Sequence, residues 1–295
     1  MTLSPYTGVG TALITPFKAD GAVDFAALES FVDFQIENGV HFLVPCGTTG
    51  ESVTMTEQEQ VDVITTTMKV AKGRAPVLAG CGGNNTAAVV AKGKKLKAAG
   101  VSHILSVSPY YNKPTQEGIY QHYRTIRRET GLDIVLYSVQ GRTGSNVEVD
   151  TVVRLVEDGI IMGIKEASGN INQIQEICSR VGDRLIVLSG DDPMTTPCVA
   201  VGGKGVISVA SNVVPQAMST WVETLLAGDF AAARAQAKPL LPLFRALFVE
   251  SNPIPCKGAA SLLGLMDAHY RLPMVPPAEG TMNLLKQVLA PFAKV

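Results

Sequence analysis

The sequence predicts an α/β protein of the (β/α)8 (TIM) barrel class with an appended C-terminal helical region. Short apolar runs rich in β-branched residues recur every 20 to 34 residues, which suits one strand and one helix per repeat. Most runs are apolar at consecutive positions, as expected for parallel strands covered on both faces. The eight runs begin near Gly8, His41, Ala75, His103, Asp133, Ile161, Leu185 and Gly205. Eight such units favour a closed barrel over an open, doubly wound sheet.

The segments between the runs carry helix signals. Asp24 is a candidate N-cap for the first helix. Thr56 followed by Glu59 has the pattern of a capping box at the start of the next helix. The buried stripe of that helix is expected at Val61, Ile64 and Met68.

The strand runs stop after about Gly228. The remaining residues show helical patterns punctuated by PLLPLF, NPIP and LPMVPP, and they are too apolar to stand alone. We therefore predict a barrel over residues 1–228, with its active site at the C-terminal ends of the strands, and a C-terminal helical region over residues 229–295.

Composition, charge and cysteine spacing argue against nucleic-acid binding, membrane insertion and secretion. With 46% hydrophobic and 17% charged residues the chain is globular, and part of its surface is expected to be covered by another subunit. A formal net charge of -1 and the lack of a run of about 20 apolar residues argue against nucleic-acid and membrane binding. Five cysteines without a CxxC pair and an N-terminus unlike a signal peptide indicate a cytoplasmic protein.

Neither a metal nor a cofactor is expected. His41 and His103 open their strands, at the end of the barrel opposite the expected site, so no histidine cluster can hold zinc there. Gly8-Val9-Gly10 has no third glycine in register, which argues against a dinucleotide.

Lys165 is the most informative polar residue. Among fourteen lysines it alone interrupts a run that reads as a buried strand, in GIKEASG. Burial of an ammonium costs several kcal/mol unless it is paired or loses its proton, and only the free amine attacks a carbonyl. The alternative is a buried ion pair with Glu166, although adjacent strand residues point to opposite faces. Tyr137 ends the preceding strand and could shuttle protons beside Lys165, or simply line the barrel.

Two further strand-end motifs could bind carboxylates. The turn in CGTTGES offers backbone N–H groups and the hydroxyls of Thr48 and Thr49, which suit a small carboxylate. Arg142 in GRTG could bind a second carboxylate through two hydrogen bonds, or be an ordinary exposed loop arginine.

Taken together, these motifs resemble the dihydrodipicolinate synthase / N-acetylneuraminate lyase family over essentially the whole chain. The motifs that carry the resemblance are GVGTALITPF, CGTTGES, SPYYNKPTQEG, YSVQGRTG, IKEASGN, SGDD, VISVASN and NPIPCK. The arginine of GRTG resembles the synthase branch, in which it binds the carboxylate of aspartate semialdehyde. The resemblance therefore implies a Schiff-base lyase that condenses pyruvate with L-aspartate 4-semialdehyde to 4-hydroxy-tetrahydrodipicolinate in lysine (diaminopimelate) biosynthesis. It also implies a homotetramer built from two dimers.

The resemblance implies roles for individual residues. Lys165 would form the imine with pyruvate, and Tyr137 would act as general acid and base. Thr48 and, from a neighbouring subunit, Tyr111 would complete a proton relay. The residues implied to bind or line the substrate are Thr49, Arg142, Gly190 and Ile207. The residues that match the family's inhibitory lysine site are Ser52, Asn84 and Tyr110.

Two departures from the family pattern carry expectations. Ser138-Val139-Gln140 replaces the usual Asn-Val-Pro before GRTG, so the loop of Arg142 is expected to be less constrained. Glu57, Gln60 and Ala88 stand where histidines and a glutamate often occur in lysine-sensitive members, which predicts weak or absent inhibition by lysine.

Two other functions stay open. One keeps the imine chemistry with another aldehyde, as in N-acetylneuraminate lyase or a 2-keto-3-deoxy sugar acid aldolase or dehydratase. The other is a non-catalytic barrel that serves as a binding protein.

Overall fold

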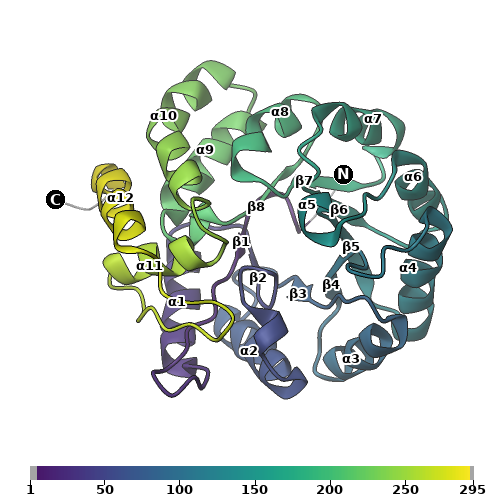
Figure 1. Cartoon of the computed structure of the whole chain (residues 1–295). Helices are drawn as coiled ribbons and strands as arrows, with labels where there is room; N and C mark the ends of the chain where they lie inside the picture. Colours follow the sequence, from purple (N-terminus) through teal and green to yellow (C-terminus); the bar gives the residue numbers. More distant parts are fainter. Residues whose placement is uncertain (1–4, 293–295) are drawn as a thin grey trace. The chain divides into compact units, whose positions relative to one another are not determined.

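A computed structural model describes residues 5–292. Strands and helices alternate along the chain in the order expected for a (β/α)8 barrel (Figure 1). The chain forms two compact units. The first comprises the residues up to Thr7 and Leu78–Ile207, and the second comprises Gly8–Val77 and the chain from Ser208 onward.

The first unit is built on a parallel sheet in which each strand pairs with the next along the chain. Its strands are β3 (Ala79–Gly80), β4 (His103–Val107), β5 (Asp133–Ser138), β6 (Gly163–Glu166), β7 (Ile186–Ser189) and β8 (Gly205–Ser208). Its helices are α3 (Thr86–Ala98), α4 (Gln116–Thr130), α5 (Gln140–Thr143), α6 (Val149–Glu157), α7 (Ile171–Val181) and α8 (Thr195–Ala200), with a 3-10 turn η2 (Asp192–Met194). Helices α3, α4, α6 and α7 lie along the outside of these strands (Figure 1).

The strands of this sheet are buried along consecutive positions, as the unbroken apolar runs predicted. All residues of β6, β7 and β8 are buried, and in β5 only the first residue is half-buried. An unpaired charge in a strand buried on both faces is energetically costly. The position of Lys165 in β6 therefore points to a chemical role for this side chain.

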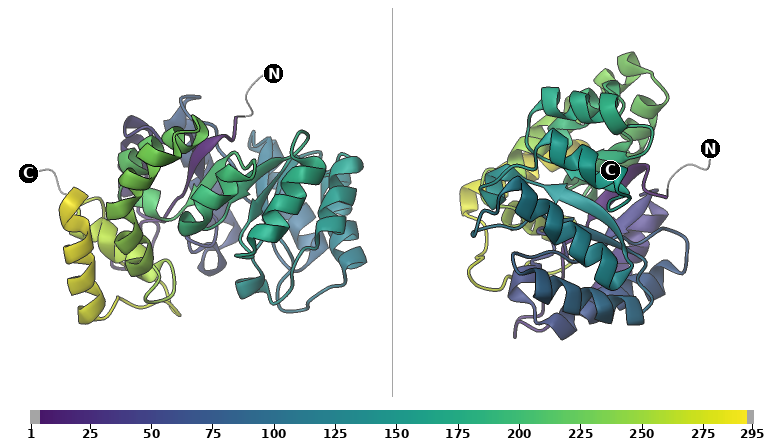
Figure 2. Two further views of the ribbon diagram at one scale, coloured as in Figure 1. Left: turned by 90° about the horizontal axis from the view of Figure 1, so that it is seen from above. Right: turned by 90° about the vertical axis from the view of Figure 1, so that its right-hand side faces the viewer.

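The second unit begins with two parallel strands, β1 (Gly8–Ala12) and β2 (Phe42–Val44), in the register Gly10 to Phe42. Its remaining elements are α1 (Phe25–Glu37), η1 (Ser52–Thr54), α2 (Glu57–Ala71), η3 (Ala210–Asn212), α9 (Pro215–Leu226), α10 (Phe230–Ala246), α11 (Ile254–Leu262), α12 (Glu279–Leu289) and η4 (Ala290–Phe292). Helix α12, in yellow in the left view of Figure 2, packs with α10 and α11. These helices are the appended C-terminal region, while the division at residue 228 stays a prediction.

The two predicted helix starts are confirmed. The Asp24 carboxylate accepts a hydrogen bond from the Ala27 N–H (3.1 Å) at the start of α1. At α2 the Thr56 N–H donates to Glu59 (2.8 Å) and the Glu59 N–H donates back to the Thr56 hydroxyl (3.2 Å). Both caps satisfy backbone donors that a helix leaves without a partner.

The predicted buried stripe of α2 is wrong at two of its three positions. Val61 and Met68 are half-buried, and only Ile64 is buried as expected. The buried residues of α2 are Val63, Ile64, Thr67 and Ala71. Among the helices within residues 5–292, none is long and apolar enough to cross a membrane.

Candidate active site

Lys165 and Tyr137 lie side by side on neighbouring strands. The register of β5 and β6 pairs Tyr137 with Lys165, and the Lys165 Nζ lies 4.2 Å from the centre of the Tyr137 ring. Both side chains are buried, with 6% and 7% of their surface exposed. Lys165 makes no ion pair with any carboxylate in residues 5–292. It is therefore a buried amine against an aromatic face.

Glu166, the alternative partner of Lys165, is engaged elsewhere. Its Oε1 accepts hydrogen bonds from the Ser168 N–H (3.1 Å) and the Gln173 side-chain amide (2.9 Å). Burial raises the pKa of the Glu166 carboxyl, which these hydrogen bonds partly oppose. Glu166 therefore belongs to a hydrogen-bonded cluster of its own and does not neutralise Lys165.

Gly190 leaves room for the Lys165 side chain at the end of β7. Its N–H donates to the Glu166 carbonyl (2.7 Å), and a Cβ at this position would lie 3.1 Å from the Lys165 Cε and 2.6 Å from the Ala167 Cβ. Burial raises the pKa of the neighbouring Asp191 carboxyl, and the Lys165 ammonium opposes that rise. Ile207 is buried in β8. A larger residue at Gly190 would displace the Lys165 side chain.

Arg142 is exposed in the short helix α5. Its N–H donates to the Val139 carbonyl (2.9 Å), and the Gly144 N–H closes the turn on the Gln140 carbonyl (2.9 Å) with Gly144 at φ +73°. Gly144 suits the left-handed conformation that ends a helix. The segment that departs from the family pattern therefore forms a closed helical turn without the proline.

Tyr110 and Tyr111 follow β4. Tyr110 is half-buried, whereas 89% of Tyr111 is exposed, and its backbone is left-handed at φ +71°. Asn84, at the start of the segment before α3, accepts a hydrogen bond from the Asn112 side chain on its carbonyl (3.0 Å). An exposed aromatic ring on a constrained backbone is suited to contact another molecule.

In the second unit, Thr48 and Thr49 lie in the turn between β2 and η1. Thr48 is exposed and Thr49 is buried, while Ser52, which begins η1, is half-buried. Cys46 and Glu51 hold left-handed conformations at the two ends of this turn (φ +57° and +53°), each of which costs about 1–3 kcal/mol for a non-glycine residue. The turn is therefore strained and depends on its surroundings.

Two side chains that sequence reasoning did not single out support this turn. The Asn252 side-chain amide donates to the Thr49 hydroxyl (2.9 Å). The Lys257 ammonium lies 2.5 Å from a Glu51 oxygen, with both side chains nearly inaccessible (0% and 2% exposed). Lys257 lies in NPIPCK, in a segment with a helical pattern, where a lysine is expected by default on the exposed side of the helix.

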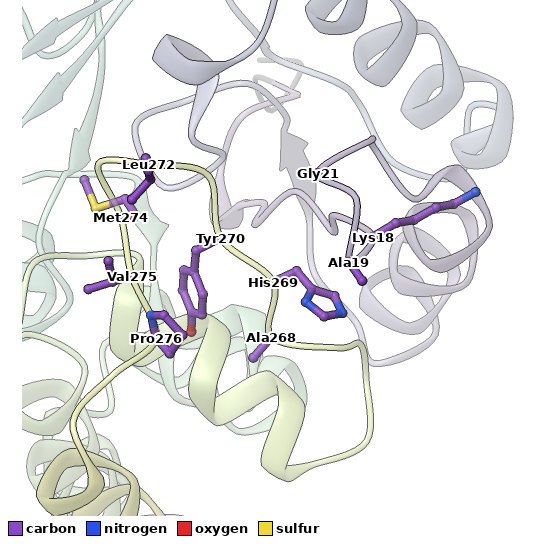
Figure 3. Close-up of a pocket in the computed structure, with 10 residues that line it drawn as sticks. All are labelled: Lys18, Ala19, Gly21, Ala268, His269, Tyr270, Leu272, Met274, Val275 and Pro276. Carbon is purple, nitrogen blue, oxygen red and sulfur yellow. The ribbon is translucent and has the colours of Figure 1, made fainter.

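A separate cavity of about 260 Å³ lies in the second unit (Figure 3). It is lined by residues of the segments 18–21 and 268–276, and none of the site residues expected from the sequence lines it. Across residues 5–292 the structure has no group of three or more His, Cys, Asp or Glu side chains that could hold a metal ion.

Known proteins resemble this chain over nearly its whole length. The model of the dihydrodipicolinate synthetase family matches residues 5–291. A 4-hydroxy-tetrahydrodipicolinate synthase of Chloroherpeton thalassium is 50% identical over 92% of this chain and 90% of its own. One from Koribacter versatilis is 48% identical over 96% and 95%.

A solved structure gives the same picture of the fold. The crystal structure of dihydrodipicolinate synthase from Aquifex aeolicus superposes with a TM-score of 0.95 at 42% identity, covering 97% of this chain and 98% of that one. The predicted fold class, a (β/α)8 barrel with C-terminal helices, is confirmed. The chain therefore belongs to the dihydrodipicolinate synthetase family.

Proposed function

We propose that Lys165 forms an imine with pyruvate, and that the resulting enamine condenses with L-aspartate 4-semialdehyde to give 4-hydroxy-tetrahydrodipicolinate. The chain is a lyase with the synthase activity of its relatives. The observation that carries the proposal is the buried Lys165 side chain, which makes no ion pair with a carboxylate of residues 5–292 and contacts the Tyr137 ring. A lysine nitrogen that is not held in an ion pair can attack a carbonyl carbon when it has given up its proton.

The chemistry follows from these groups. The Lys165 amine adds to the pyruvate carbonyl and water leaves, giving the imine. Loss of a methyl proton makes an enamine, whose carbon attacks the aldehyde of the second substrate. The amine of that substrate then attacks the imine carbon, which closes the ring and frees Lys165. Each step moves a proton, and we assign these transfers to Tyr137 as general acid and base.

The other roles are assigned by residue type and motif. Thr48, with Tyr111 from a neighbouring subunit, relays protons to and from Tyr137. Thr49 and the adjacent backbone N–H groups bind the pyruvate carboxylate. The backbone of Gly190 and Ile207 lines the pocket. Arg142 binds the carboxylate of aspartate semialdehyde, as its guanidinium geometry allows.

A panel of aldehydes assayed with pyruvate tests the substrate assignment. We expect product with aspartate semialdehyde and little with N-acetylmannosamine or sugar-derived aldehydes. Arg142→Ala should raise the KM for aspartate semialdehyde at least about tenfold, since a charge-assisted hydrogen bond contributes roughly 1.5–3 kcal/mol. The KM for pyruvate should stay unchanged. A preference for a sugar-derived aldehyde, or an unchanged KM for aspartate semialdehyde, would contradict the assignment.

We also propose a cytoplasmic homotetramer. The exposed ring of Tyr111 supports contact with a second subunit. The five cysteines, all within residues 5–292, form no disulfide, as expected for a reducing compartment. Light scattering at working concentration measures the assembly directly.

A further inference from the structure

We propose that Asn252 and Lys257 are positioning residues for the turn that binds the pyruvate carboxylate. Asn252 directs the hydroxyl of Thr49, and Lys257 holds Glu51 in its left-handed conformation. The inference rests on the proposed function, because it assigns the Thr48–Glu51 turn to pyruvate. It gives the C-terminal segment 252–257 a part in substrate binding.

The bond to Thr49 sets the direction of its hydroxyl. Asn252 is buried, and its Nδ2 donates to the Thr49 Oγ1 (2.9 Å). A hydroxyl has one proton to donate. Because its oxygen already accepts from Asn252, the Thr49 proton is free to point at an acceptor such as a carboxylate.

The ion pair fixes the other end of the turn. Glu51 is left-handed at φ +53° directly after Gly50, where a Cβ would lie 3.0 Å from the Leu13 carbonyl and 3.2 Å from the Cys46 N. The turn therefore has little room to relax. The Glu51 Oε1 lies 2.5 Å from the Lys257 ammonium, and its other oxygen has no hydrogen-bond partner within residues 5–292. Lys257 is the polar contact that holds the Glu51 side chain.

Lys257 makes further contacts besides the ion pair with Glu51. Its ammonium also donates to the His269 carbonyl (2.9 Å) and lies 4.2 Å from the Phe17 ring centre and 5.3 Å from that of Tyr270. The Tyr270 hydroxyl donates to the Ile254 carbonyl (2.9 Å), which ties this wall to the start of α11. His269 and Tyr270 also line the cavity of Figure 3. Because these contacts fix the Lys257 ammonium, they also fix the Glu51 carboxylate that pairs with it.

A purely structural role is the competing explanation. Many buried ion pairs contribute little net stability, and replacing both partners by neutral groups is often tolerated. A structural role would lower stability without changing the affinity for pyruvate. A positioning role would weaken pyruvate binding and leave turnover at saturating pyruvate nearly intact.

The test uses the full-length chain with Lys257→Met, Glu51→Gln and the double variant. Pyruvate is titrated against imine formation, trapped by borohydride, and against steady-state turnover. Lys257→Met should raise the half-saturating pyruvate concentration about tenfold or more, because small misplacements of binding groups are costly. The kcat at saturating pyruvate should fall less than about threefold. The double variant should be no worse than either single variant, since the two residues act as one unit.

Asn252→Ala keeps the proposal testable if the ion-pair variants do not fold. It should also raise the half-saturating pyruvate concentration with little change in kcat. Leu243→Ala is the stability-matched control, because this buried α10 side chain lies in the same unit and destabilises without touching the turn. Its pyruvate dependence should match that of the wild type.

Two results would overturn the inference. One is an unchanged pyruvate dependence in folded Lys257→Met or Asn252→Ala, and the other is an equal change in Leu243→Ala. Failure of the proposed function is distinguishable, because the wild type would then form no trapped imine with pyruvate at all.

Discussion

Two buried lysines with opposite surroundings mark this protein at the residue scale. Lys165 contacts the face of Tyr137 and makes no ion pair with a carboxylate of residues 5–292, so its nitrogen is not held by such a pair. Lys257 touches a carboxylate, a carbonyl and two aromatic rings, so its ammonium is occupied by these contacts and is not available for reaction. Burial lowers the pKa of Lys257, and the carboxylate of Glu51 opposes that change. The neighbours of a buried lysine therefore decide its role.

Tyr137→Phe removes the hydroxyl of this residue and keeps its ring, so the roles of the two groups can be told apart. The ring would still pack against Lys165, but no group could transfer protons. We expect kcat to fall by about 10²–10⁴-fold with a nearly unchanged KM for pyruvate. Tyr123→Phe is the matched control, because it removes one buried hydroxyl that donates to the Ser106 carbonyl (2.9 Å) away from Lys165. A loss of less than threefold in Tyr137→Phe would show that another group carries the protons.

The sequence predicted Lys165 but not Lys257, for a physical reason. An unbroken apolar run of strand length implies burial on both faces, so a charge within it is conspicuous. A helix has an exposed side, and a lysine in NPIPCK can be placed there by default. Only the fold, which buries α11 from Ile254 to Ala260, shows that this side is covered too.

At the scale of single elements, the sequence predicts helix caps better than it predicts the buried face of a helix. The cap of α1 and the capping box of α2 are local, so the sequence specifies them. The stripe of α2 depends on which face meets α1, which sequence spacing leaves ambiguous. Thr67 can be buried there because its hydroxyl donates to the Val63 carbonyl (2.8 Å).

Helix α4 contains a group that makes the fold sensitive to acid. His122 is buried, its Nδ1 lies 2.9 Å from the Thr86 hydroxyl, and burial lowers its pKa to about 4 from 6.5. As pH falls from 6.5 to 4, the unfolded chain gains a proton that the folded chain does not, so stability is lost. The loss from this one residue is on the order of 3 kcal/mol.

His122→Gln should remove this part of the acid sensitivity, because glutamine does not titrate. Urea unfolding at pH 7 and at pH 4 gives the free energy of unfolding for the variant and the wild type. We expect the drop between the two pH values to be smaller in the variant by roughly 2–3 kcal/mol. Equal drops in the two proteins would refute this account of His122.

At the scale of the whole molecule, the C-terminal helices share a compact unit with residues 8–77. The sequence predicted these helices as an addition after the last strand. It could not predict their contacts with the CGTTGES turn, because these join residues about 200 positions apart. The strand alternation, by contrast, repeats along the chain and is visible in any window of the sequence.

Regulation also belongs to this scale, because the resemblance implies an inhibitory lysine site between subunits. Ala88 is exposed at the start of α3 and offers no carboxylate to an inhibitor's ammonium. We expect half-inhibition only above about 1 mM lysine, a binding free energy weaker than about -4 kcal/mol. Ala88→Glu should lower that concentration. Sub-millimolar inhibition of the wild type would contradict the prediction.

Borohydride trapping tests the central claim most directly. Pyruvate and borohydride are added together, and the digested protein is analysed by mass spectrometry, with Lys165→Arg as the control. We predict one reduced pyruvate adduct per chain, on the peptide that contains Lys165, and none in the control. An unlabelled protein, or an adduct on a different lysine, would contradict the assignment of Lys165 as the imine-forming residue.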